Sequence, residues 1–144
     1  MTWKISATND LTTSELHTIF RERVKVFVVE QECPYQEIDD HDLHADHVFK
    51  MEGNELLAYA RVLDKGDYVA FGRVLVNKNH RGKRLGEELL QQVMDLIKTK
   101  FDQRVVKIEA QAHLEKFYGA FGFMKNSDVF LEDGIPHIEM IWKK

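Results

Sequence analysis

The chain has 144 residues, of which 44% are hydrophobic and 31% charged, and its formal net charge is -4. This length suits one domain that buries roughly two-thirds of its unfolded surface, and the composition excludes a disordered chain. The charge balance, without a broad basic stripe, excludes extended nucleic-acid binding, and no apolar run approaches the roughly 18 residues that span a bilayer. The lone Cys33 cannot form an intrachain disulfide and the N-terminus lacks the apolar core of a signal peptide. We therefore expect a cytoplasmic protein.

The first elements are a strand and a capped helix. Residues 3–7 favour an opening strand, and Thr12 with Glu15 forms a capping box before apolar positions that recur up to Phe27. Residues 26–31 then combine β-branched side chains with a helical pattern, so the sequence does not decide where the helix ends.

Residues 36–47 read QEIDDHDLHADH, the most unusual composition in the chain. A zinc site from His41, His44 and His47 is disfavoured, because this spacing does not put all three on one helix face and no cysteine supports them. The glycine and glutamate of a calcium loop are missing, so we expect no metal. One interpretation is a solvated loop. In the other, its carboxylates attract a cationic amine, or His47 or a carboxylate removes a proton from that amine.

Three strands are predicted next, at residues 47–52, 55–63 and 68–76. The first two are separated by Gly53-Asn54, which is typical of a hairpin, and the third is separated from them by a polar turn that contains Gly66. We expect the three to form an antiparallel meander.

The stretch from residue 71 to residue 100 combines a buried strand, a basic loop and an amphipathic helix. The strand ends at Val74-Leu75-Val76, and the loop Arg81-Gly82-Lys83-Arg84-Leu85-Gly86 opens a helix with apolar residues at spacings of three and four. Glycine lets the backbone approach a ligand, and the free N–H groups of a helix start favour anions. The loop predicts a pyrophosphate cradle, although a plain tight turn with solvated basic residues is the alternative. Neither the Walker spacing nor the three-glycine dinucleotide pattern fits.

The last elements complete a mixed sheet. A strand at residues 104–110, following a helix, indicates parallel pairing with the strand that ends at Val76. A short helix then stops at Gly122, and residues 129–131 and 138–142 are expected to form a terminal strand pair.

Two segments, in order, resemble the GNAT superfamily of acetyl-CoA-dependent N-acetyltransferases. The strand ending at Val76 and the loop at residues 81–86 look like motif A, usually Arg/Gln-x-x-Gly-x-Gly/Ala, although Arg84 stands where the first signature glycine belongs. Residues 111–123 look like motif B, with Gln111 at the usual Asn position.

Two further segments resemble the ElaA-like branch of the GNAT proteins. The first runs from Phe20 through Arg23 to Tyr35 with Glu37 and Asp39, and the second is residues 132–140. The resemblance implies an α/β fold in a single GNAT-like domain over residues 1–144. Its mixed sheet of about six to seven strands would be flanked by about four helices and splayed at the acetyl-CoA site.

The resemblance also implies roles for the site residues. Tyr118, in the motif B pattern Tyr-x-x-x-Gly-Phe, would be the general acid that protonates the departing thiolate. The general base stays open, with Glu109 and His47 as the first candidates beside Glu30, Asp39 and His137. The cofactor-binding residues would be Val74, Leu75, Val76, Arg81, Gly82, Lys83, Arg84, Leu85, Gly86 and Gln111.

Three functions follow from this sequence. The first is an N-acetyltransferase that moves the acetyl group of acetyl-CoA directly to a primary amine of a small molecule or peptide in a ternary complex. The second is a CoA-binding sensor module with little or no turnover. The third is a structural partner protein. We expect no nucleic-acid or membrane partner, and the sequence does not choose between a monomer and a homodimer.

Overall fold

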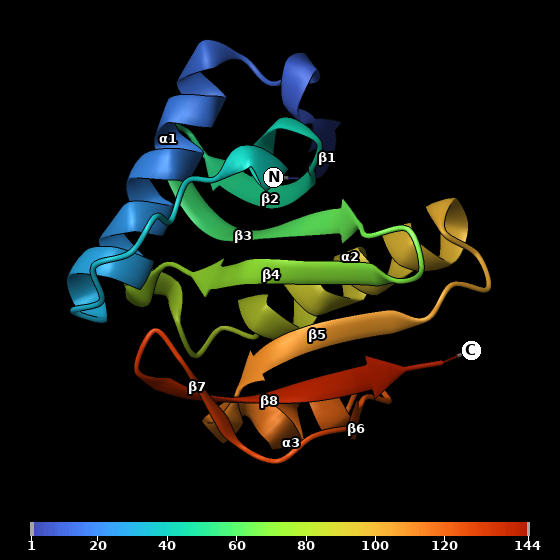
Figure 1. The fold of residues 1–144 in the computed structure, drawn as a ribbon. Coiled ribbons are helices and arrows are strands. Elements are labelled where there is room, and N and C mark those ends of the chain that lie inside the picture. The colour runs from blue at the N-terminus through green and yellow to red at the C-terminus, as the bar shows by residue number, and fades with distance from the viewer. Residues whose placement is uncertain (1, 144) are drawn as a thin grey trace.

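The computed structural model describes residues 2–143, which form one twisted mixed sheet with helices on both faces (Figure 1). Within these residues the sheet has eight strands in the order β1-β2-β3-β4-β5-β8-β6, and β7 pairs with β8. The strands are β1 (Trp3–Ala7), β2 (Asp46–Glu52), β3 (Glu55–Asp64), β4 (Val69–Val76), β5 (Val106–Gln111), β6 (Met124–Lys125), β7 (Phe130–Glu132) and β8 (Ile135–Trp142).

The α-helices of the described chain are α1 (Thr13–Val24), α2 (Leu85–Lys100) and α3 (Glu115–Gly119). Shorter 3-10 turns are η1 (Thr8–Asp10), η3 (Asp40–Leu43), η4 (Lys78–His80) and η5 (Ala112–Leu114). The expected α/β class and mixed sheet are confirmed, with eight strands instead of six or seven and three α-helices instead of four.

The capping box predicted at the start of α1 is formed by Thr12 and Glu15, each of which accepts a hydrogen bond from the other's backbone N–H. The ambiguous residues after α1 are a π-helix, η2 (Lys25–Glu30). The β-branched residues there do not form a strand, because the helix continues with a wider turn. Insertions of this kind are frequent at functional sites.

The predicted antiparallel meander is formed by β2, β3 and β4, with β1 antiparallel beside β2. The register between β3 and β4 shifts, since Tyr59 lies opposite Leu75 whereas Arg61 lies opposite Gly72. Arg73 occupies the shifted position with a φ of 52°. An extra residue in one strand bends it and increases its twist, so the end of β4 stays paired with β3 but turns away from β5.

The parallel contact between β4 and β5 is confined to one end. The register pairs Val69 with Val106, and β5 then pairs along its length with β8 instead. Figure 1 shows the two strands side by side near their starts and apart near their ends. The sheet is therefore splayed at the C-terminal ends of β4 and β5.

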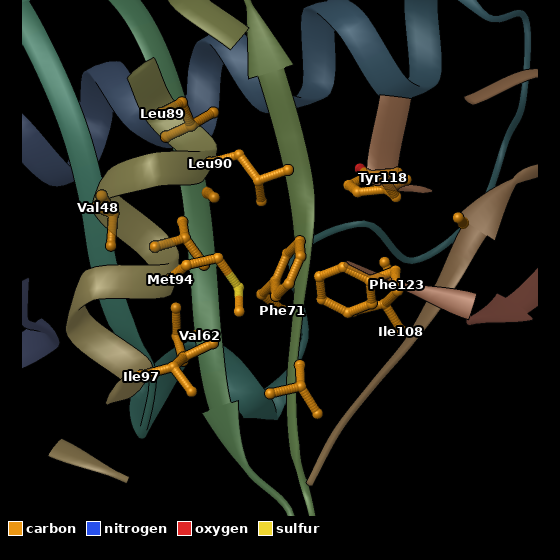
Figure 2. Close-up of a cluster of buried hydrophobic side chains, with 14 of the residues drawn as sticks. Val48, Val62, Phe71, Leu89, Leu90, Met94, Ile97, Ile108, Tyr118 and Phe123 are labelled. Atoms are coloured by element: carbon orange, nitrogen blue, oxygen red, sulfur yellow. The ribbon is translucent and has the colours of Figure 1, made fainter. Parts of the chain in front are cut away.

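Two hydrophobic clusters hold the layers together. The larger one packs the apolar stripe of α2 against β2 to β5 and β8. Figure 2 shows Leu89, Leu90 and Ile97 of this stripe facing the strands that carry Val48, Val62 and Phe71. The smaller one, on the other face, joins Ile19 and Phe27 to the side chains of β2 to β4. Because helices cover both faces of the sheet, its splayed end is where a ligand can reach the strands.

Candidate active site

A cleft of about 1170 Å³ lies where β4 and β5 separate. The end of β4, the face of β5, η2, α3 and the β7–β8 turn all contribute to its walls, together with residues 31–39. Its volume exceeds the roughly 300–1,000 Å³ of pockets for one small ligand. The cleft therefore has room for two substrates at once.

The end of β4 presents free backbone to this cleft. The Asn77 N–H donates to the Leu57 carbonyl at 2.9 Å, and Ala58 lies opposite Val76. In an antiparallel ladder this pattern makes Ala58 and Val76 a non-hydrogen-bonded pair, so the Val76 N–H and C=O point away from β3. The Val76 carbonyl accepts a hydrogen bond from Arg81 Nε at 3.1 Å.

The loop before α2 begins the helix without a side-chain cap. Arg84, at the position of the signature glycine, has a φ of 61°, and Gly82 has a φ of 87°. Arg84 thus adopts the left-handed conformation that glycine takes readily, so the departure from motif A leaves this backbone geometry in place. A Cβ on Gly86 would make ordinary contacts with Phe117 at 3.6 Å and Val76 at 3.8 Å, which fits the Gly/Ala alternation of the motif.

The basic residues of this loop are exposed, but they do not all reach the cleft. Arg81 lines it and pairs with Glu30 at 3.1 Å, whereas Lys83 and Arg84 are exposed beside it. Leu85 is 7% exposed and packs in the larger core, so it offers only its backbone. Gln111, at the end of β5, also lines the cleft.

Tyr118 is 4% exposed and lines the cleft from α3. Its ring lies 6.1 Å from the rings of Phe71 and Phe123 and packs beside them in Figure 2. Burial raises the pKa of the Tyr118 phenol to about 12. The phenol therefore keeps its proton at every physiological pH.

His47 lies inside the protein and away from the cleft. It is 0% exposed, with Nδ1 2.6 Å from the Tyr59 hydroxyl and Nε2 2.8 Å from the Thr8 hydroxyl. Thr8 donates its proton to the Asp42 carbonyl. Because the Thr8 hydroxyl has only one proton, it must accept its other hydrogen bond from His47 Nε2–H. Nδ1 of His47 then carries no proton and accepts from the Tyr59 hydroxyl. Burial lowers the pKa of His47 to about 4, and because both nitrogens are occupied we no longer consider it as the base.

The other base candidates all line the cleft, in different surroundings. Glu30 pairs with Arg81, Asp39 pairs with Arg61 at 2.7 Å, and His137 Nδ1 lies 2.7 Å from the Ile135 carbonyl. Glu109 is exposed on β5, and its interaction with Glu132, together with burial, raises the pKa of Glu132 to about 7. Glu132 was not among the site residues expected from the sequence. Its position directly before the Asp133-Gly134 turn was the available signal, because it places Glu132 at the end of a hairpin strand.

A buried ion network supports the wall at residues 31–39. Arg23, 0% exposed, binds Glu37 at 2.9 Å and Asp42 at 2.6 Å, and Arg61 binds Asp39 and Asp42 at 2.7 and 3.0 Å. Burial opposes charge on these groups, but the bonds to Arg23 and Arg61 keep the pKa of Asp42 below its ordinary value. The acidic segment is therefore mainly an internal support, which the sequence composition did not reveal.

The fold and the cleft together define the class of this protein. The chain belongs to the GNAT family, since the family model described as an acetyltransferase (GNAT) domain matches residues 11–144. More particularly, it is 41% identical to Protein ElaA of Escherichia coli (strain K12) over 143 residues, which cover 96% of this chain and 94% of that protein. The resemblance to the ElaA-like branch is thus confirmed.

Solved structures agree with this assignment. The crystal structure of Escherichia coli ElaA superposes with a TM-score of 0.95 at 38% identity, covering 99% of this chain and 100% of that one. An acyl-CoA N-acyltransferase from Pseudomonas aeruginosa superposes with a TM-score of 0.93 at 39% identity, covering 99% of both chains.

Residues 2–143 lack two further features. Among the helices of this part of the chain, none is both long and apolar enough to cross a membrane. No group of three or more His, Cys, Asp and Glu side chains there is arranged to hold a metal ion.

Proposed function

We propose that this protein is an N-acetyltransferase that moves the acetyl group of acetyl-CoA to a primary amine of a small molecule or peptide, by direct transfer in a ternary complex. One observation carries the proposal: a single cleft contains the open edge of β4, the uncapped start of α2 and the phenol of Tyr118. These are the three features that a thioester donor with a diphosphate group needs. The lone, buried Cys33 supports a cytoplasmic location.

The donor would occupy the side of the cleft next to β4 and α2. The pantetheine arm would pair with the free backbone at Val76 as an added strand does. Its pyrophosphate would meet the free N–H groups at the start of α2, where the helix dipole also favours negative charge. Arg81, Lys83 and Arg84 would add positive charge around the same phosphates.

The chemistry needs a neutral amine, a stabilised oxyanion and a proton for the thiolate. The amine nitrogen would attack the thioester carbonyl carbon, and the Val76 N–H would donate to the oxygen that becomes negative. As the C–S bond breaks, Tyr118 would give its proton to the sulfur, and the nitrogen would lose one proton as the amide forms, which restores the phenol. A phenol with a pKa of about 12 is a weaker acid than a thiol, so this proton moves together with the departure of the sulfur and not before it.

The test combines binding and turnover. Acetyl-CoA should raise the thermal unfolding midpoint by several degrees, since a ligand at about a hundred times its Kd adds roughly 2.7 kcal/mol. CoA release should then be measured with alkylamines, arylalkylamines and peptides with a free α-amino group. Tyr118→Phe should lower kcat by about 10² or more without changing the Kd of acetyl-CoA.

Tyr68→Phe is the matched control, because Tyr68 lies at the far end of the cleft, just before β4 meets β5. An unchanged kcat in Tyr118→Phe would contradict the role of the phenol. Binding of acetyl-CoA without transfer to any amine would instead identify a CoA-binding sensor module. No binding at millimolar acetyl-CoA would contradict the prediction that the loop at residues 81–86 binds the pyrophosphate.

A further inference from the structure

His137 lies on β8 and points to the face of the sheet opposite the larger hydrophobic cluster. The residues Ile138 and Met140 of the same strand belong to that cluster, together with Tyr118. Side chains alternate between the two faces along a strand, so His137 points to the other face. Tyr118 and His137 both line the cleft. They therefore reach it from opposite faces of the sheet.

The strand register places His137 at the splayed end of the sheet. In the antiparallel pairing of β5 with β8 it lies opposite Gln111, the last residue of β5. The strands β4 and β5 are apart at this end, where the Val76 N–H would meet the thioester oxygen. Glu109 and Glu139 form the next pair on the same face, two positions farther from the opening. Among the ionisable side chains of this strand pair, His137 is therefore the one nearest the thioester.

The His137 ring is held from two sides, and its tautomer is fixed. Nδ1 lies 2.7 Å from the Ile135 carbonyl oxygen, which can only accept, so Nδ1 carries the proton of the neutral ring. Phe130 of β7 stacks on the ring, with 6.2 Å between the centroids and 25° between the planes. Nε2 then has no proton and can accept one. In His47, by contrast, both nitrogens are engaged inside the protein.

Glu132 faces the nitrogen that would receive the proton. It ends β7 opposite Ile135, and its Oε2 lies 3.5 Å from His137 Nε2. The interaction with Glu109 and burial raise the pKa of Glu132 to about 7, so its carboxyl group is ionised at pH 8. An ionised carboxylate at this distance favours the protonated form of an imidazole. Glu109 and Glu139, which also line the cleft, add negative charge that attracts an ammonium group.

We propose that Nε2 of His137 is the general base that takes a proton from the acceptor's ammonium group, and that Glu132 stabilises the resulting imidazolium. This role rests on the acetyltransferase function proposed above. The ammonium N–H bond breaks, its proton bonds to Nε2, and the freed lone pair attacks the thioester carbon. Tyr118 gives its proton to the sulfur and regains one from the nitrogen. The proton on Nε2 leaves to solvent through the open cleft, which restores the neutral ring.

The first experiment compares two acceptors of similar size at pH 8. One is the most active aliphatic amine of the panel above, which is mostly a charged ammonium at this pH, and the other is its β,β-difluoro analogue, which is mostly neutral. His137→Asn keeps an N–H for the Ile135 carbonyl and removes Nε2. Its kcat/KM should fall by about 10² or more with the charged amine, but by less than about threefold with the neutral one.

His44→Asn is the matched control, because His44 is exposed and lies outside the cleft. We expect its kcat/KM with both amines to equal that of the wild type. The unfolding midpoint and the Kd of acetyl-CoA should match the wild type in both variants, which separates the loss of a base from a loss of structure or of donor binding.

A second experiment needs no substrate. In protein labelled with ¹⁵N at the histidine side chains, His137 at pH 8 should show a protonated Nδ1 and an unprotonated Nε2, and His137→Asn assigns its signals. A proton on Nε2 instead would overturn the proposal. Equal losses with the two amines in His137→Asn would also overturn it, as would an unchanged kcat/KM, and both results would leave the acetyltransferase function standing. No transfer by the wild type to any amine would instead defeat that function, and this role with it.

Discussion

Replacing Arg23 with methionine should reveal what the buried ion network contributes to stability. The Arg23 guanidinium donates from Nε to Glu37 at 2.9 Å, and from Nη1 and Nη2 to Asp42 at 2.6 and 3.0 Å. Methionine keeps much of the side-chain volume and suits the helix, so the change mainly removes the charge. It leaves Glu37 and Asp42, which are 2% and 3% exposed, short of a partner.

The expected loss follows from those contacts. Breaking a buried ion pair by removing one partner costs about 3–5 kcal/mol. Arg61 still lies 3.0 Å from Asp42 and Arg73 still lies 2.7 Å from Glu37, so the lower end of that range applies. With an unfolding entropy of about 2.1 cal/mol/K per residue, a loss of about 3 kcal/mol lowers the midpoint by about 10 °C.

Urea and thermal unfolding of Arg23→Met and Arg21→Met measure this directly. Arg21 is the matched control, because its side chain is 53% exposed and pairs with the adjacent Glu22. We expect its replacement to change the free energy of unfolding by less than about 0.5 kcal/mol. A loss below about 1 kcal/mol in Arg23→Met would show that the network adds little net stability.

Two other measurements test the loop before α2 and the buried ionisable groups. Arg84→Gly and Arg84→Ala remove the same charge, but only glycine adopts the φ of 61° without strain, so the glycine variant should be more stable by about 1 kcal/mol; equal stability would contradict strain at this position. His47, whose pKa burial lowers to about 4, is neutral when folded, so the free energy of unfolding should fall as the pH drops from about 6.5 to 4, and less so in His47→Gln. Despite the opposing effect of burial, the bond to Arg61 lowers the pKa of Asp39 to about 2, which should extend the loss of stability from about pH 4 down to 2. A free energy of unfolding that stays flat between pH 6.5 and 4 would contradict the buried neutral His47.

Elements with local signals could be predicted from the sequence. Thr12 and Glu15 lie three positions apart in the first turn of α1, the apolar stripe of α2 repeats within one helix, and the Asp133-Gly134 pair favours a tight turn. Each of these patterns depends on residues a few positions apart. The mixed sheet followed from the order of the elements along the chain, and the α/β class from the resemblance to the GNAT superfamily.

The acidic segment shows why the rest could not be predicted. Glu37 and Asp42 bind Arg23, which lies 14 and 19 positions away, and composition does not reveal that the three meet inside the protein. His47 is hidden for the same reason, since Tyr59 and Thr8 come from other elements. A dense run of charges is ordinarily a solvated surface, and here distant arginines reverse that expectation.

The same network connects the sheet irregularity to the cleft. Arg73 has a φ of 52° at the register shift, and its Nη2 donates to the Glu37 carbonyl at 2.8 Å, which Arg23 Nη2 also binds, at 3.1 Å. A residue other than glycine holds such a conformation only where its surroundings compensate the strain. Glu37, through its backbone carbonyl and its buried carboxylate, therefore stabilises both the bent end of β4 and the wall at residues 31–39. The acceptor would then meet a rigid wall, while the donor phosphates would meet an exposed loop, so selectivity for the amine should depend on the side chains that line this wall.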